Sequence, residues 1–240
     1  MDINEFEEDL KRHLNSISIK LEEKQIKQFY GYMNLLIEWN KKINLTAIIE
    51  PKEIVLKHFV DSLTISKYIN QKSTLIDVGT GAGFPGIPLK IFRNDLEITL
   101  VDSLNKRIKF LDDVIKKLNL DNIKTVHGRV EEIGRNKEYR EKFDYATSRA
   151  VANIATLSEY LIPLIKTNGK CIYMKGPDTK DELKKGEKAI SVLGGNMVNK
   201  VEFELPYSKI KRTIIIIEKI KNTPIIYPRK AGTPSKEPIE

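Results

Sequence analysis

The sequence predicts an α/β protein with a mostly parallel, doubly wound sheet of seven strands that ends in an antiparallel hairpin, preceded by an N-terminal helical extension. Two observations support this prediction. From Ser73 onward, short β-rich segments alternate with helical segments, which is typical of parallel βαβ units. The last two strand segments, 197–206 and 212–220, are too close for the crossover that a parallel pair needs, so they are expected to form a hairpin.

The first 70 residues have helical periodicity. Apolar residues recur at three- and four-residue steps on one predicted helix face, namely Ile26, Phe29, Tyr30, Met33, Leu36 and Ile37. A second helix is expected to begin at Pro51 and run through Leu63, because proline is tolerated in a first helical turn. No linker follows, so the extension (1–70) is expected to pack on the core domain (71–220).

Five short segments supply the parallel strands expected in this core: 74–79, 97–102, 123–127, 143–148 and 169–175. A helix with apolar residues at spacings of three and four separates the second strand from the third, and another spans about 178–193. The basic tail, 221–240, carries four prolines, so it is expected to be extended rather than helical.

Composition restricts the function classes. The 240 residues include 41 Lys and Arg against 33 Asp and Glu, and this excess of +8, which leans toward the C-terminal end, favours a polyanionic partner. On composition alone, a Lys- and Ile-rich sequence without such a partner explains the charge equally well. Short apolar runs and an acidic start predict neither a membrane span nor a signal peptide. A single cysteine, Cys171, and three scattered histidines indicate a reducing, cytoplasmic setting without a disulfide or zinc site.

The most informative segment is the glycine-rich loop that follows the first expected strand, and two patterns overlap in it. Gly81-x-Gly83-x-x-Gly86, followed by Asp102, matches the dinucleotide fingerprint of nicotinamide-dependent oxidoreductases. Asp77-x-Gly79-x-Gly81-x-Gly83 is similar to motif I of Rossmann-like class I S-adenosylmethionine (AdoMet) methyltransferases, in which the loop wraps the methionine end and ribose of AdoMet.

The methyltransferase pattern is favoured for two reasons. Pro85 and Pro88 would fall in the turn and helix that a dinucleotide pyrophosphate needs. The terminal hairpin also resembles the reversed last strand of the methyltransferase sheet. A glycine turn without a ligand is the third interpretation, but three glycines alternate at the carboxyl end of a strand, where such sheets bind ligands.

Residues after the next two strands are candidates for binding the adenosine half of AdoMet. The Asp102 carboxylate can accept hydrogen bonds from the ribose hydroxyls, although it can also cap the next helix, a role open to Ser103 or Asn105 as well. Val130 is expected to pack on adenine and Glu131 to reach its exocyclic amine, although acidic residues are common at helix starts in any case.

The fourth strand ends at Thr147-Ser148-Arg149-Ala150, the position that flanks the methyl donor in such enzymes. It lacks the Asn/Asp-Pro-Pro-aromatic sequence of exocyclic-amine enzymes and the Pro-Cys of C5-cytosine enzymes. The acceptor is therefore expected to have an accessible lone pair, as guanine N7 has, and to attack the methyl group directly without a base. Arg149 is expected to hold the guanine Hoogsteen edge or a phosphate rather than to form a structural ion pair.

Basic residues at the same edge of the sheet are candidates for holding RNA. Lys106 and Arg129 are expected to clamp backbone phosphates, whereas Lys109 is expected to face solvent. His58 and Asp61, about one helical turn apart, are expected to form a buried structural hydrogen bond.

Motifs along nearly the whole chain resemble the bacterial ribosomal RNA small subunit methyltransferase G family (glucose-inhibited division protein B). They are Glu38–Asn40 with Ile43–Thr46, Lys57–Phe59 with Asp61-Ser62, Asp77–Pro88, Val101–Leu104 with Lys106-Arg107, Arg129–Glu131, Ser148–Ala150, and Tyr227–Lys230 with Gly232 and Pro234.

The resemblance implies AdoMet-dependent methylation of N7 of guanine 527, in the 530 loop of 16S rRNA, free or in the small ribosomal subunit. Matched position by position, it implies AdoMet contacts at Gly79, Phe84, Val130, Glu131 and Arg149. A monomer that needs neither metal nor membrane is expected. A nicotinamide-dependent oxidoreductase and a non-catalytic RNA-binding module stay open as alternatives.

Overall fold

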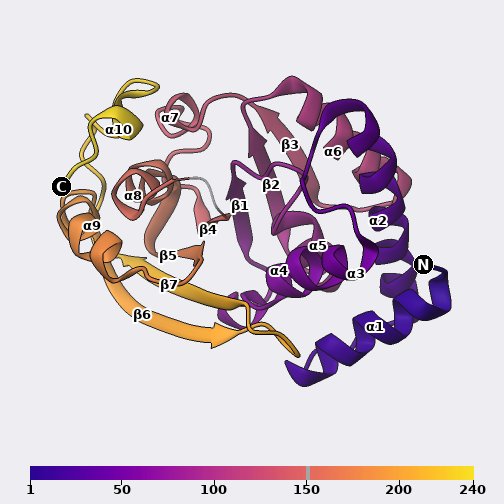
Figure 1. Ribbon diagram of the computed structural model, residues 1–240. Helices are drawn as coiled ribbons and strands as arrows, with labels where there is room; N and C mark the ends of the chain where they lie inside the picture. The colour runs from indigo at the N-terminus through magenta and orange to yellow at the C-terminus, as the bar shows by residue number, and fades with distance from the viewer. Residues whose placement is uncertain (150–151) are drawn as a thin grey trace.

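Seven strands form one sheet in the order β3-β2-β1-β4-β5-β7-β6 in the computed structural model, which describes residues 1–149 and 152–240 (Figure 1). The strands are β1 Thr74–Val78, β2 Glu97–Asp102, β3 Ile123–His127, β4 Phe143–Arg149, β5 Ile165–Lys175, β6 Gly195–Glu204 and β7 Lys211–Lys219. The strands β1 to β5 pair in parallel, and β7 is antiparallel to both β5 and β6. The predicted seven-stranded α/β fold with its terminal hairpin is confirmed.

The direction of winding reverses between β1 and β4, which are neighbours in the sheet. From β1 the chain proceeds outward through β2 to β3, and then returns to the other side of β1 as β4. Asp77 near the end of β1 pairs with Thr147 of β4, so the glycine loop and Arg149 leave the sheet beside each other. In doubly wound sheets this carboxyl edge is where ligands bind.

Helices cover both faces of the sheet (Figure 1). They are α1 Ile3–Ser16, α2 Glu23–Ile43, α3 Pro51–Ile54, α4 Asp61–Leu63, α5 Gly86–Phe92, α6 Asn105–Lys117, α7 Val130–Ile133, α8 Ile154–Leu161, α9 Lys180–Val192 and α10 Thr233–Lys236. Successive strand residues serve opposite layers: in β7, Ile214 and Ile216 pack with α1, α2, α5 and α6, whereas Ile215 and Ile217 pack with α8 and α9. Burial on both faces explains the continuous apolar run Ile214–Ile217 in β7.

The segment after Pro51 is helical through Leu63, as predicted, but its middle is a π-helix, Val55–Val60. The backbone N–H of Asp61 donates to the carbonyls of Leu56 and His58 rather than to that of Lys57. The Lys57 carbonyl is therefore available to a side chain from elsewhere in the chain. Single π turns are frequent at functional sites, and no simple sequence signal marks this one.

The tail departs from the expectation of a wholly extended segment, because Thr233–Lys236 form the one-turn helix α10. Gly232 takes a left-handed conformation (φ +82°) and Pro234 lies in the first turn, where its fixed φ suits a helix. The tail is held against the core by an ion pair of 2.7 Å between Arg229 and the buried carboxylate of Glu159. Among the described residues, no helix is long and apolar enough to cross a membrane.

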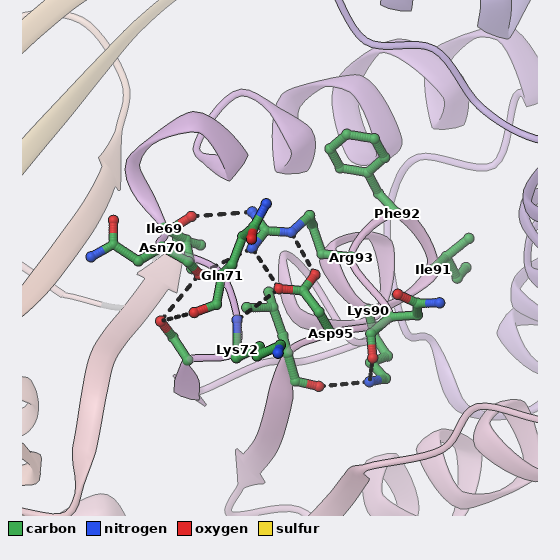
Figure 2. Close-up of polar contacts among 12 residues, drawn as sticks. Ile69, Asn70, Gln71, Lys72, Lys90, Ile91, Phe92, Arg93 and Asp95 are labelled. Carbon is green, nitrogen blue, oxygen red and sulfur yellow. Dashed lines mark hydrogen bonds and ion pairs between the residues drawn. The ribbon is translucent and has the colours of Figure 1, made fainter.

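Arg93, which follows α5, joins the helical extension to the core (Figure 2). Its guanidinium donates to the carbonyls of Ile69 (3.1 Å) and Asn70 (3.0 Å) and forms two hydrogen bonds to Asp95. The Arg93 hydrogen bonds hold the pKa of Asp95 well below its ordinary value. Asp95 also accepts the backbone N–H of Lys72 at 2.8 Å, so this arginine and carboxylate organise the entry to β1.

Arg93→Ala is expected to lower the free energy of unfolding by about 2 kcal/mol, because it removes two hydrogen bonds to backbone carbonyls and both charge-assisted hydrogen bonds to Asp95. Lys27→Ala, which removes an exposed i,i+4 pair with Glu23, is the matched control and is expected to cost less than about 0.5 kcal/mol. Urea unfolding followed by circular dichroism measures both. Equal changes in the two variants would contradict the assigned role of Arg93.

Candidate active site

The glycine loop is closed over a buried carboxylate at the end of β1. Asp77 is fully buried, and its Oδ2 accepts the Thr80 hydroxyl at 2.6 Å and the Gly86 backbone N–H at 2.9 Å. Gly79 and Gly81 have φ values of +64° and +62°, which side-chain-bearing residues rarely adopt. One aspartate thus ties both ends of the loop, and the left-handed glycines turn the backbone between them.

Asp77 acts beneath the loop rather than on its open side. Its Oδ1 is buried and has no hydrogen-bond partner within the part of the chain that the structure describes. Burial is the main cause that raises its pKa to about 6, partly offset by the hydrogen bonds from Thr80 and Gly86. Gly83 (φ +95°) also faces the protein, because a Cβ there would lie 2.8 Å from the Tyr32 hydroxyl. The structure therefore places Asp77 and Gly83 as supports of the loop.

A cavity of about 500 Å³ opens on the outer side of the loop, within the size range of small-molecule sites. Its lining residues are Leu45, Thr46, His58, Gly79, Thr80, Gly81, Ala82, Phe84, Asp102, Ser103, Arg107 and Arg149. A Cβ built on Gly81 would meet no atom of the described residues within 4 Å, so the bare loop backbone borders open space there. We call this space the first cavity.

Asp102, at the end of β2, closes one side of the first cavity. Its Oδ2 accepts the Gly81 N–H at 3.0 Å and Nη1 of Arg107 at 3.2 Å, and its Oδ1 accepts the Leu104 N–H at 2.9 Å. Asp102 thus orders the turn into α6, and the helix N-cap itself, Leu104, makes no side-chain capping bond. Of the two basic residues at the start of α6, Arg107 lines the cavity, whereas the predicted Lys106 beside it is exposed.

The residues expected at adenine lie under the C-terminal tail. Glu131 is 4 % exposed, and its Oε1 accepts the Gly232 backbone N–H at 2.8 Å. Val130 is half-buried at the start of α7, and Arg129 before it is exposed. The lining described for the first cavity includes none of these three, so the structure does not bring them to the glycine loop, and their roles stay predictions.

Arg149, at the end of β4, is the centre of the site. Its Nη1 donates to the Lys57 carbonyl at 2.9 Å and lies 3.3 Å from Oδ2 of Asp61, and its Nη2 bonds Nδ1 of His58 at 3.0 Å. Burial lowers its pKa, and the Asp61 carboxylate opposes that shift. Arg149 therefore does form a structural ion pair, with Asp61, which was not expected from the sequence. Ala150, the last residue of this motif, lies outside the described residues.

The expected hydrogen bond between His58 and Asp61 is wrong, because both ring nitrogens of His58 are used elsewhere. Nδ1 accepts from Arg149, and Nε2 then carries the proton and donates to the Thr46 hydroxyl at 3.0 Å, a tautomer assigned from this network. Burial and the Arg149 cation lower the pKa of His58 to about 3, so its ring is neutral near pH 7. Phe84 stacks on this ring at 4.3 Å between centroids.

A second cavity of about 410 Å³ adjoins the first. Its lining residues are Ile48, Lys57, His58, Asp61, Arg149, Met174, Lys175, Gly176 and Arg212. Among the described residues, His58 and Arg149 line both cavities. Sequence reasoning did not single out Lys175 or Arg212, although their positions at the end of β5 and the start of the antiparallel β7 place both at this edge.

No cluster of three or more metal-ligating residues occurs within 1–149 and 152–240.

The strand order and the glycine loop after β1 define the fold of a class I AdoMet-dependent methyltransferase. The M. jannaschii TYW2 structure in complex with AdoMet is similar in fold, with a TM-score of 0.53, 13 % identity, and coverage of 67 % of this chain and 75 % of that chain.

Sequence comparison is more specific. The family model for rRNA small subunit methyltransferase G matches residues 25–212. The chain is 53 % identical to the Ribosomal RNA small subunit methyltransferase G of Desulforamulus reducens, over 99 % of this chain and 100 % of that protein. Identity to the protein of the same name from Alkaliphilus oremlandii is 51 %, over 98 % and 100 %. The chain belongs to the rRNA small subunit methyltransferase G family, as the resemblance predicted.

Gly86→Ala is expected to lower the free energy of unfolding by about 1–3 kcal/mol, because the added methyl collides with Leu100 and lies 2.9 Å from Oδ2 of Asp77. Gly176→Ala is the matched control, since a Cβ there meets no described atom within 4 Å. Denaturant unfolding of both variants checks the expectation. A Gly86→Ala protein as stable as the wild type would show that Asp77 does not need this close approach.

His58 is expected to make the fold acid-sensitive. Its folded pKa of about 3 lies below the ordinary 6.5, so below about pH 6.5 the unfolded chain binds a proton that the folded chain does not. Stability at this site is therefore lost as the pH falls, by about 2 kcal/mol between pH 7 and pH 5. His58→Gln removes this loss, whereas His127→Gln, at an exposed ring, is the control. The free energy of unfolding of each variant is measured in urea at these pH values. Equal changes between pH 7 and pH 5 in the wild type and His58→Gln would contradict the role of His58.

Proposed function

We propose that the protein transfers a methyl group from AdoMet to N7 of guanine 527 in the 530 loop of 16S rRNA. The observation that carries this proposal is the pair of adjoining cavities that share Arg149. One is bordered by the glycine loop and Asp102, and the other by Lys57, Lys175 and Arg212. A cofactor and an anionic nucleotide would thus meet at Arg149.

The residues of the first cavity fit AdoMet. The open backbone at Gly79 and Gly81 leaves room for the methionine part, and the Asp102 carboxylate lies at the cavity wall for the ribose hydroxyls. Phe84 offers an apolar ring beside them, held by stacking on His58. Val130 and Glu131 are proposed to hold adenine from α7. When bound, AdoMet supplies a methyl group on a sulfonium, which makes that methyl electrophilic.

The chain's own contribution to the reaction is then positioning. Guanine N7 carries an accessible lone pair, so no residue has to remove a proton from the acceptor. The titratable groups at the junction support this, because His58 is neutral and its Nδ1 is already bonded to Arg149, while Oδ2 of Asp61 bonds two arginines. Arg149 is held by three groups, the Lys57 carbonyl, the His58 ring and the Asp61 carboxylate, and can orient the acceptor rigidly. Orientation of this kind supplies a large part of many rate enhancements.

The basic residues support an RNA acceptor, either free 16S rRNA or the assembled small subunit. Lys57, Lys175 and Arg212 line the second cavity, and the exposed Lys106 and Arg129 follow β2 and β3 at the same edge of the sheet. We propose that this rim contacts backbone phosphates, so that added salt weakens RNA binding far more than AdoMet binding. The proposed setting is a cytoplasmic monomer.

The proposed function is tested by incubating the purified protein with labelled AdoMet and either 16S rRNA or small subunits, and by mapping the methylated nucleotide. N7-methylguanine at position 527 is expected. No methylation of either RNA, methylation at another position, or binding of NADH in place of AdoMet in a calorimetric titration would reject the proposal.

Arg149→Lys is expected to lower methyl transfer about 100-fold, and to lower the affinity for AdoMet by a much smaller factor. Lysine keeps the charge beside Asp61 but loses the rigid fork that bonds Lys57 and His58. The measurements are single-turnover methyl transfer and calorimetric AdoMet binding. Arg93→Lys, a half-buried arginine away from both cavities, controls for lost stability. Near-normal turnover by Arg149→Lys would remove Arg149 from the proposed mechanism.

A further inference from the structure

We infer that the second cavity is a guanine pocket, in which Oδ1 of Asp61 accepts hydrogen bonds from the N1–H and 2-amino edge of the base. The inference rests on the proposed function and deepens it, because it names the residue that selects guanine. It follows from an unused carboxylate oxygen, from the arrangement of the two cavities, and from the shape of the base.

Asp61 holds a carboxylate oxygen that the described protein leaves unsatisfied. The residue is 2 % exposed, and its Oδ2 lies 3.0 Å from Nε of Arg212 and 3.3 Å from Nη1 of Arg149. Its Oδ1 is buried and finds no hydrogen-bond partner in residues 1–149 and 152–240. Burying a carboxylate oxygen costs free energy unless a hydrogen-bond donor reaches it. Since Asp61 lines the second cavity, a ligand there can supply that donor.

The two arginines give this carboxylate a fixed orientation. Arg149 comes from β4 and Arg212 from β7, and both engage Oδ2. The plane of the carboxyl group is thereby held while Oδ1 is left over. Because both ion pairs use Oδ2, a ligand donor that approaches Oδ1 from the second cavity does not have to break them.

The arrangement of the cavities matches the two edges of guanine. N7 lies on one edge of the purine, and the N1–H and 2-amino donors lie on the edge away from it. Asp61 lines the second cavity and is not part of the described lining of the first. A guanine whose N7 faces the first cavity therefore directs its donor edge toward the side where Asp61 lies. Ile48 and Met174 offer apolar contacts for the base in a space of about 410 Å³.

Adenine cannot use this acceptor. It carries N1 as an acceptor and has no amine at C2, so it would set a lone pair against the carboxylate oxygen. Adenine does have an N7 with a lone pair, so N7 reactivity alone does not exclude it. A site that is built to bond a donor rejects the analogue that lacks it far better than a site of shape alone.

The test compares two 16S rRNA substrates that carry guanine or adenine at the target position. The wild-type protein is expected to prefer guanine in kcat/KM by more than about 100-fold. In Asp61→Asn the amide oxygen keeps the arginines, and the NH₂ replaces Oδ1 and opposes the guanine donors. This variant is expected to lose about 10- to 100-fold in kcat/KM for guanine, to lose preference over adenine by a similar factor, and to keep its AdoMet affinity.

The control is Asp9→Asn. Asp9 in α1 is also nearly buried, pairs with Arg12 at 2.8 Å and has one oxygen without a partner among the described residues, but lines neither cavity. The preference of Asp9→Asn for guanine over adenine is expected to equal that of the wild type. If Asp61 has only a structural role, Asp61→Asn lowers kcat/KM for the guanine and the adenine substrates by the same factor. An unchanged ratio of the two kcat/KM values would therefore overturn the inference.

The wild-type protein provides a test that does not depend on folding of a variant. Equal methylation of guanine and adenine substrates would also overturn the inference. Failure of the wild type to methylate the guanine substrate would instead reject the proposed function itself. The two failures are therefore distinguishable.

Discussion

The buried guanidinium of Arg149 is the constraint around which this site is built. A cation out of water needs partners for its donors. Here the π-helix supplies the Lys57 carbonyl and the His58 ring, and the start of α4 supplies the Asp61 carboxylate. These partners belong to the helical extension, whereas Arg149 ends a strand of the sheet. One side chain thus fixes the extension against the sheet edge and forms the wall between the two cavities.

The extension also shapes the glycine loop, so it is part of the site and not an addition to a complete core. The Tyr32 hydroxyl of α2 donates to the Ala82 carbonyl, and its ring packs near Phe84 (5.5 Å between centroids). The His58 ring stacks on the same Phe84 ring. Residues from outside the sheet line the second cavity together with residues of β5 and β7.

Local patterns predicted the sheet, the hairpin and the glycine loop, since a five-residue apolar run or a string of glycines carries its own structural meaning. The π turn, the helix α10 and the role of Asp61 escaped prediction because each depends on distant partners. Asp61 meets Arg149 across 88 positions, and Glu131 meets Gly232 across 101. The sequence favoured Lys106 over Arg107 as a functional residue. The turn that Asp102 holds decides which of the two lines the first cavity, and local sequence does not reveal that turn.

The strand order has a consequence for how the protein is made. The last strand of the chain, β7, lies between β5 and β6, so β6 has no neighbour in the sheet until β7 has been synthesised. Arg212, the second partner of Asp61, comes with that strand, 151 positions after the carboxylate. During vectorial synthesis the parallel half can assemble first. The second cavity therefore stays incomplete on the nascent chain until β7, with Arg212, has been synthesised.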